Sequence, residues 1–406
     1  MKRFFLFSAL LLAFPLFLTG TERYLDVRNL TTLDVLLFEL QPTSNLTISA
    51  FDGDVTIRAG QRSWTQEMDQ PAFAISVHNG QIQVRHPEFR GTVSELIFET
   101  DDSSMIRMNH PEAGFRYYRG SMRIHINTDR RTFRIINTVL LEDYIASVVG
   151  GEMNFPEMEA LKTQAVIART YALWSLAHSS HNEYQLTDHT LNQVYKGILI
   201  NRPDYLRAAL STSGEVLTWS GRLVLAAYSS TCGGQTSDNE SIWSGNPLPY
   251  LRSVSDGDAC SESPHFRWNY EVATNRIYQV LSRHTNRQIS EIRVGNVDRH
   301  GLVTNIIARD NRGNEAEIRA NTFRLLVNQQ IEHNSIRSTR FQMNRIGNNY
   351  IFEGKGLGHG IGLCQWGARG LAQSGWNYRD ILKLYYKGAE VVDIHSLEQP
   401  ILHLAN

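Results

Sequence analysis

One glutamate, Glu152, occupies an unusual place in the stretch VVGGEMNFPEM, residues 148–158. It follows Gly150 and Gly151 and precedes a short link to a helix that we expect to open at Pro156. That helix has acidic residues of its own for its N-terminus, so it does not need Glu152 there. The glycines would let the link adopt backbone conformations that other residues resist. Apolar neighbours would desolvate the carboxyl and raise its pKa, which makes Glu152 a candidate proton donor, although a solvated loop glutamate fits the composition too.

A second stretch, FEGKGLGHGIGLCQWGARGLAQSG, is rich in glycine over residues 352–375. Glycine alternates with other residues from Gly354 to Gly362, around Lys355 and His359. Missing side chains let a backbone approach an extended ligand and expose its amide donors. The stretch has neither the Gly-Lys-Ser/Thr of a phosphate-binding loop nor a dinucleotide fingerprint. We predict a substrate cradle, with a glycine-rich β-turn as the alternative.

The chain has three cysteines, Cys232, Cys260 and Cys364. Three cysteines are too few, and odd in number, to form a disulfide framework. No Cys-x-x-Cys pair is present. A disulfide, free thiols and metal ligands all remain open; three thiolates with one imidazole would form a closed, structural zinc site. Between the first two cysteines, Trp243 and Tyr250 supply flat surfaces of the kind on which sugars stack.

The charge composition does not indicate a nucleic-acid or acidic-membrane partner. The 40 Lys and Arg residues nearly cancel 41 Asp and Glu among 406 residues, so no global field attracts the chain to nucleic acid or to an acidic membrane surface. The N-terminus, MKRFFLFSALLLAFPLFLTG, has the basic start, apolar run and small residues of a secretory signal over residues 1–20. We expect export to the periplasm or cell envelope, with membrane contact only if the signal stays uncleaved.

Hydrophobic periodicity predicts an α+β fold. Alternating residues around Asp-Gly and Asn-Gly turns predict antiparallel hairpins from about residue 46 to 139. Apolar residues spaced three and four apart then predict helices over 141–148 and 158–172. We expect an N-terminal β-rich module (residues 21–116), a mixed helical and antiparallel-sheet catalytic body (117–390) and a C-terminal tail (391–406).

Seven ordered stretches resemble the stage II sporulation protein D (SpoIID) family, which includes proteins called amidase enhancers. They are LEDYIASVVGGEM, EALKTQAVIARTYAL, LTDHTLNQVYKG, TCGGQT, LPYLRSV, SIRSTRF and GKGLGHGIGLCQWGARGLA, over about residues 141–372. The resemblance implies a peptidoglycan lytic transglycosylase, acting in wall remodelling or septal division, that prefers glycan strands already stripped of stem peptides by an amidase. By the motif, the family's catalytic acid falls on Glu152.

The resemblance also implies supporting residues. Arg169 could meet the lactyl carboxylate of the sugar or pair with a structural acid, which is the more frequent fate of a helix arginine. Further candidate sugar contacts are Gln193, Tyr195, Lys355, His359 and Gln365.

Some family members hold zinc with thiolates, one of them at the TCGG position, which is Cys232 here. Cys260 is then the first expected partner. Ser229 stands where a histidine often precedes this block, so a ligand from that place would have to be replaced, for which Cys364 is a candidate.

One carboxylate suffices for such chemistry. A hydrolase needs two acids, whereas a lytic transglycosylase can use Glu152 first as the acid on the glycosidic oxygen and then as the base on the 6-hydroxyl of the same muramic acid. The intramolecular attack gains from proximity. Two alternatives remain: a binding protein that grips glycan and recruits or stimulates an amidase, and a zinc-dependent amidase, for which the chain lacks a His-x-x-Glu-His or His-Glu-x-x-His run.

Overall fold

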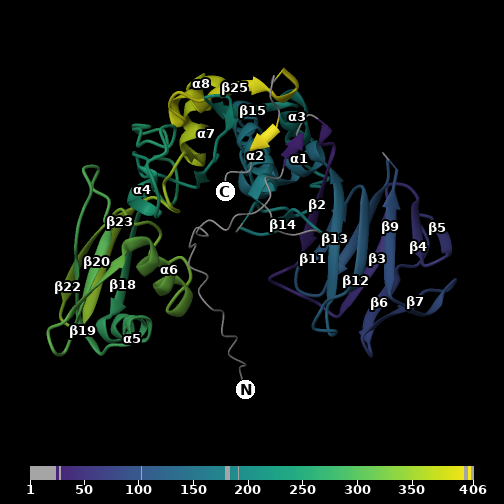
Figure 1. The fold of residues 1–406 in the computed structure, drawn as a ribbon, viewed down its shortest axis with the longest axis horizontal. Coiled ribbons are helices and arrows are strands. Elements are labelled where there is room, and N and C mark those ends of the chain that lie inside the picture. The colour runs from purple at the N-terminus through teal and green to yellow at the C-terminus, as the bar shows by residue number, and fades with distance from the viewer. Residues whose placement is uncertain are drawn as a thin grey trace.

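The computed structural model describes residues 24–26, 29–101, 103–178, 183–190, 192–396 and 401–403. The expected signal sequence lies outside these residues. The described part forms an arch, with an N-terminal β-sandwich at one end, a helical body at the top and a C-terminal lobe at the other end (Figure 1). Within this part of the chain, none of the helices has the length and hydropathy that a membrane crossing requires.

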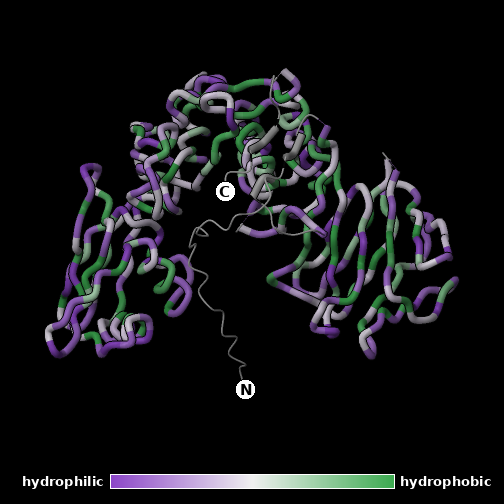
Figure 2. Tube along the Cα trace, viewed as in Figure 1, coloured by the Kyte–Doolittle hydropathy of each residue, from purple (hydrophilic) through white to green (hydrophobic). Residues whose placement is uncertain are grey.

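The N-terminal sandwich consists of two antiparallel-rich sheets. One has the order β11-β10-β3-β6-β7-β8 and the other β14-β2-β13-β12-β9-β4-β5. Alternate residues are buried, such as Ile57, Phe98 and Ile124, and the hydropathy of its strands alternates accordingly (Figure 2). The strands are β2 (Thr32–Leu37), β3 (Asn45–Phe51), β4 (Val55–Ala59), β5 (Arg62–Gln66), β6 (Phe73–His78), β7 (Gln81–Arg85), β8 (Arg90–Val93), β9 (Glu95–Thr100), β10 (Met105–His110), β11 (Gly114–Tyr118), β12 (Ser121–Ile126), β13 (Phe133–Leu140) and β14 (Leu186–Thr187).

The helical body follows the sandwich directly, because β13 runs into the first helix. Here α1 packs on α2 and α3, and α2 packs also on α7 and α8. The helices are α1 (Leu141–Glu152), α2 (Met158–His178), α3 (Pro203–Ser211), α4 (Asn239–Ile242), α7 (Gln365–Gln373) and α8 (Tyr378–Tyr385), with a 3-10 turn at Ile394–Ser396. Short strands complete it: β15 (Glu215–Trp219), β16 (Arg222–Leu223), β17 (Tyr228–Ser229), β24 (Leu363–Cys364) and β25 (Glu390–Asp393); β1 (Tyr24–Asp26) pairs with β26 (Ile401–His403).

The C-terminal lobe has a hydrophobic core of its own, built around residues such as Ile277, Phe323 and Phe352. Two three-stranded sheets, β18-β23-β22 and β19-β20-β21, enclose it with two helices. The elements are β18 (Arg267–Ala273), α5 (Thr274–Thr285), β19 (Ile289–Val294), β20 (Asn305–Asp310), β21 (Glu315–Arg319), α6 (Ala320–Gln330), β22 (Phe341–Ile346) and β23 (Asn349–Lys355).

The structure confirms the α+β class and corrects details of the organisation. Asn79-Gly80 closes the β6–β7 hairpin, but Asp52-Gly53 carries the chain from one sheet of the sandwich to the other, because β3 and β4 pair with different partners. The expected boundary between residues 116 and 117 falls inside β11, and β12 and β13 extend the sandwich to Leu140. The expected tail begins inside β25, which pairs with β15. The expected single catalytic body contains two cores.

Candidate active site

Glu152 is the last residue of α1, so the expected loop placement is wrong. Gly150 and Gly151 lie inside the helix, and neither has a positive φ. Their role is close packing: a Cβ on Gly151 would lie 2.3 Å from the Val194 carbonyl oxygen, and one on Gly150 would lie 2.5 Å from the ring of Tyr205. The glycine pair therefore brings the end of α1 against the segment that contains Val194.

That segment holds the Glu152 carboxylate. The backbone N–H of Val194 donates to Oε1 of Glu152 at 2.9 Å, and the Tyr228 hydroxyl is a second donor. Glu152 is partly exposed, yet enough protein surrounds its carboxyl to desolvate it. Desolvation raises its pKa above the ordinary value, while the two hydrogen bonds and the charge of Lys196 offset part of the rise. A carboxyl in this environment retains a proton at higher pH than a solvated glutamate.

Glu152 is also held through its backbone. Gln365, the first residue of α7, donates from Nε2 to the Glu152 carbonyl oxygen at 3.1 Å and lies 3.3 Å from Oε1 of Gln164. Gln365 is 7% exposed, so the expectation of a sugar contact is replaced by a role in positioning the end of α1.

Three other predicted sugar contacts are fully buried. Arg169 pairs with Glu142, with Nε 2.9 Å from Oε1, and its other nitrogens donate to the carbonyls of Glu215 and Ala209. Gln193 accepts a hydrogen bond from Tyr144, and Tyr195 donates to Asn137 at 2.6 Å. These groups bond within the protein and are out of reach of solvent, so the structure shows Gln193 and Tyr195 in internal contacts and bears out, for Arg169, the alternative of pairing with a structural acid.

The glycine-rich stretch packs against other segments of the chain and hydrogen bonds with them. Gly356, Gly358 and Gly362 have positive φ, and a Cβ on any of them would meet residues 227–232 within 2.9 Å. Backbone amides of the stretch donate internally: Leu357 N to Thr231 O, and Gly358 N to the carbonyl of Arg337. The amides of Leu357 and Gly358 are therefore not free to bind a substrate. Glycine allows two chain segments to lie closely side by side instead.

Two predicted residues of that stretch keep partly exposed side chains, Lys355 and His359. The His359 ring lies 5.1 Å from the ring of Trp243, accepts from Ile361 N at Nδ1 and hydrogen bonds the backbone of Tyr228. Burial lowers the pKa of His359 to about 4, and the charge of Arg324 contributes. His359 is therefore a neutral ring near neutral pH. It adjoins the residue whose hydroxyl holds Glu152.

The three cysteines converge, together with Asp256, which no motif in the sequence indicated. One donor atom from each lies within 4.8 Å of the others, and all four residues are buried. Cys232 Sγ lies 3.7 Å from Cys260 Sγ and 3.1 Å from Oδ2 of Asp256, and none of the three cysteines is in a disulfide. Asp256 stands four residues before Cys260, a spacing that could have indicated a shared site.

The four side chains of this cluster differ in how readily they lose a proton. Burial raises the pKa of Cys232 and Cys364, whereas hydrogen bonds from these thiols lower the pKa of Cys260 to about 3. Burial raises the pKa of Asp256 to about 6. Backbone N–H groups of Cys232 and Gly367 point at Cys364 Sγ, at the N-terminus of α7. Buried sulfurs with such donors, beside one carboxylate, are a set that could bind a metal ion.

Comparison with known proteins relates this chain to bacterial cell-wall proteins. A family model described as SpoIID, stage II sporulation protein, matches residues 129–219, and a domain of unknown function, DUF8618, matches residues 257–362. An uncharacterized protein of Brachyspira hyodysenteriae is 30% identical over 75% of this chain and 78% of its own length. Stage II sporulation protein D of Bacillus subtilis is 27% identical over 66% and 79%, and the amidase enhancer of the same species is 26% identical over 57% and 37%.

Proposed function

The chain belongs to the SpoIID family and has a cell-wall-related role, and from this premise we propose that it is a peptidoglycan lytic transglycosylase that cleaves the bond between N-acetylmuramic acid and N-acetylglucosamine. The observation that carries the proposal is the state of Glu152: partly exposed, desolvated, and fixed by Val194 and Tyr228. We further propose that the chain is exported and acts in the cell envelope.

Glu152 performs both proton transfers. In its protonated form it donates to the glycosidic oxygen as the bond from that oxygen to C1 of the muramic acid breaks. The carboxylate then accepts the proton of the 6-hydroxyl, whose oxygen bonds to C1 and closes a 1,6-anhydro ring. Water is not consumed. The groups that shift the pKa of Glu152 among the described residues include no second carboxylate, which suits a mechanism with one acid.

The test incubates the purified chain with peptide-free glycan strands and analyses the ends by mass spectrometry, beside Glu152→Gln. We expect 1,6-anhydro ends from the unchanged chain and a loss of rate of about 100-fold or more in the variant, because the amide cannot donate the proton. Ends with free reducing sugars would indicate a hydrolase. Glycan binding without any product from either protein would favour a binding protein that recruits or stimulates an amidase, the activity named in the amidase enhancer.

We also propose that Cys232, Cys260, Cys364 and Asp256 hold a structural zinc ion. Thiolates bind zinc at about 2.3 Å, so two of them at a tetrahedral angle lie about 3.8 Å apart. The Cys232–Cys260 separation of 3.7 Å fits this spacing. Zinc would tie the segment after Tyr228 to the start of α7, and so support two of the elements that hold Glu152.

Metal analysis of the purified chain tests this site. Zinc should copurify in stoichiometric amount, and Cys364→Ser should lose it and melt at a lower temperature. A metal-free chain of unchanged stability after chelation would exclude the structural role, and loss of free thiols on oxidation without metal would support the disulfide alternative.

A further inference from the structure

The outer face of the six-stranded sheet β11-β10-β3-β6-β7-β8 is hollowed. The hollow has a volume of about 400 Å³, within the range of ligand sites, and all of its lining belongs to the N-terminal sandwich. The sandwich forms one end of the arch (Figure 1), so this hollow is separate from the site around Glu152 in the helical body. Its lining includes Thr47, Ala74, Arg85 and Asn109.

One row of residues, each directly opposite the next, crosses all six strands through this hollow. Their neighbours in the chain, such as Ile48 and Ile75, are buried in the core, so the row points outward. Five steps between strands make the row about 24 Å long. Its middle residues are small and its end residues are large, which suits an extended chain lying along the row. From β11 to β8 the row is Phe115, Asn109, Thr47, Ala74, Arg85 and Arg90.

This face carries arginines without acids. The six strands contain no Asp or Glu, and the acids nearest to them in sequence, Glu88 and Glu112, lie in the turns beyond the strand ends. Arg85 and Arg90 are exposed and directly opposite each other, an arrangement in which like charges repel. Among the described residues, neither of them nor Arg107 of β10 forms an ion pair. An anionic ligand would relieve this repulsion.

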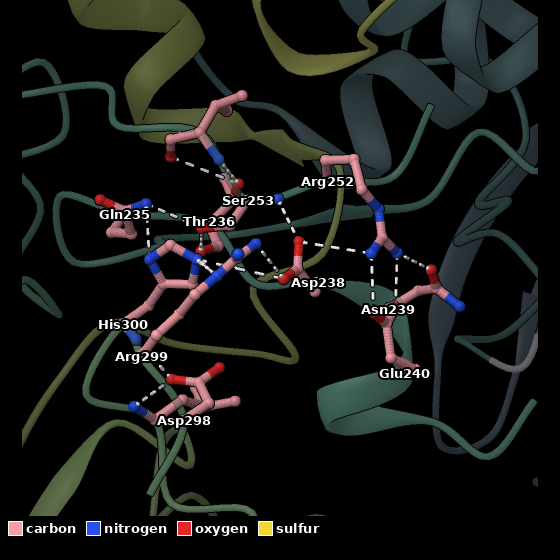
Figure 3. Close-up of polar contacts among 12 residues, drawn as sticks. Gln235, Thr236, Asp238, Asn239, Glu240, Arg252, Ser253, Asp298, Arg299 and His300 are labelled. Carbon is pink, nitrogen blue, oxygen red and sulfur yellow. Dashed lines mark hydrogen bonds and ion pairs between the residues drawn. The ribbon is translucent and has the colours of Figure 1, made fainter. Parts of the chain in front are cut away.

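Arginines at the junction of the helical body and the C-terminal lobe differ from these. Figure 3 shows Asp238 between Arg252 of the body and Arg299 of the lobe, at 3.7 Å and 3.2 Å. Arg340 donates to backbone carbonyls on both sides of the same junction. The junction arginines therefore hold two parts of the chain together, whereas those of the outer sheet face have no such structural task.

The remaining side chains of the face are of kinds that bind sugars. The Phe115 side chain is 61% exposed, and the guanidinium of Arg107 lies 5.5 Å from its ring. A neighbouring row places Asn45, Ser76 and Gln83 opposite one another, with amide and hydroxyl groups facing outward. A flat ring offers a stacking surface to a sugar, the amides and hydroxyls match its hydroxyls, and unpaired guanidiniums match an acidic group.

We propose that this outer face is an accessory binding site for an acidic polysaccharide, the glycan of the cell wall. The proposal rests on the cell-wall role in the proposed function, but not on the chemistry of Glu152. Lactyl groups and stem peptides both supply carboxylates, so the site binds strands with and without peptides. Its effect is to keep the chain attached to the wall through a stretch of glycan that is not being cut.

The experiment measures binding in the Glu152→Gln background, so that strands are not cut. The probes are soluble peptidoglycan strands that retain their stem peptides, and chitin oligosaccharides as an uncharged counterpart. Arg85→Gln with Arg90→Gln should weaken binding of the strands about tenfold or more and leave binding of chitin unchanged. Ala74→Tyr, which fills the hollow without a change of charge, should weaken binding of both. Arg58→Gln with Arg131→Gln is the matched control, because both arginines are exposed on the same sandwich outside this sheet.

The outcomes separate this site from the proposed function. Unchanged binding of strands by the Arg85/Arg90 and Ala74 variants, or an equal loss in the control pair, would overturn the site. Arginine-dependent binding of phosphatidylglycerol vesicles without binding of strands would overturn it too, since the face would then fit a lipid surface. Arginine-dependent binding of strands by a chain that forms no anhydro ends would leave the site standing and refute the transglycosylase. Equal melting temperatures of the arginine and control variants show that any loss of binding is not a loss of folding.

Discussion

Arg169 in the helical body and Arg324 in the C-terminal lobe have the same side chain in different surroundings. Arg169 is fully buried, and Glu142 with two backbone carbonyls occupies its guanidinium. Arg324 is partly exposed, and its side chain donates to the neutral Asn321. The difference teaches that a charge serves a ligand only where the fold has not already neutralised it. In this chain the helical body holds Glu152 and neutralises its buried arginine, whereas Arg324 of the lobe contacts a neutral amide.

The largest expected effect is a loss of stability when the buried arginine of the helical body is replaced. Arg169→Met should lower the free energy of unfolding by about 3–5 kcal/mol, because it leaves Glu142 and two buried carbonyls without their partner. Arg324→Met should change it by about 1 kcal/mol or less, because no acid is left unpaired. Denaturant titration of both variants measures the contrast. Similar losses of stability in the two would show that Arg324 is also structural.

A smaller effect should separate positioning from binding. Gly151→Ala would press a methyl group against the Val194 carbonyl and should destabilise the chain by about 1–3 kcal/mol. Because Val194 holds the Glu152 carboxylate, kcat should fall with little change in KM. Steady-state kinetics on peptide-free glycan tests the split. Gly150→Ala, which meets side chains instead of that carbonyl, is the control.

The pH dependence of activity tests the proposed role of Glu152, which the helical body holds. Since desolvation raises the pKa of Glu152, activity that needs its protonated form should persist to higher pH than for a solvated glutamate. Tyr228→Phe removes a hydrogen bond that stabilises the carboxylate, so the alkaline limb of kcat/KM should move to still higher pH. Tyr278→Phe, in the C-terminal lobe, should leave it in place. A downward movement in Tyr228→Phe would contradict the geometry.

The same pKa shift has a consequence for stability. The folded state of Glu152 binds its proton more tightly than the unfolded state, so this group contributes stability below its unfolded pKa, and the contribution is lost as pH rises through the folded pKa. Glu152→Gln should therefore be slightly more stable than the unchanged chain at neutral pH, as measured by denaturant titration, and the two should converge in acid.

The smallest effect concerns the junction of the two regions. The Arg299 side chain is 75% exposed in its pair with Asp238, so Arg299→Gln should cost less than about 1 kcal/mol. Thermal melting at low and high salt measures it. A loss of several kcal/mol would show that the lobe is held by this pair more than by Arg340.

Much of the local structure follows from the sequence. The three-and-four spacing of Leu161, Ala165 and Ala168 predicted α2, and those side chains are fully buried in it. The Asn79-Gly80 turn predicted the β6–β7 hairpin, and both residues have the positive φ of its turn. The hairpin predicted at Asp52-Gly53 is wrong, because β3 and β4 pair with other strands. A turn-forming sequence does not determine whether the two strands beside it pair with each other. Strand pairing depends on distant partners.

For the site, the sequence by itself determined the ingredients: a glutamate after two glycines, three thiols, and a glycine-rich stretch beside a histidine. Only the tertiary structure decided which polar groups remain available. It buried Arg169 against Glu142, brought Asp256 to the cysteines across the chain, and left Arg324 without an acid. The physical reason is range: periodicity and turn signals act over a few residues, whereas burial and charge neutralisation depend on residues far apart in the sequence.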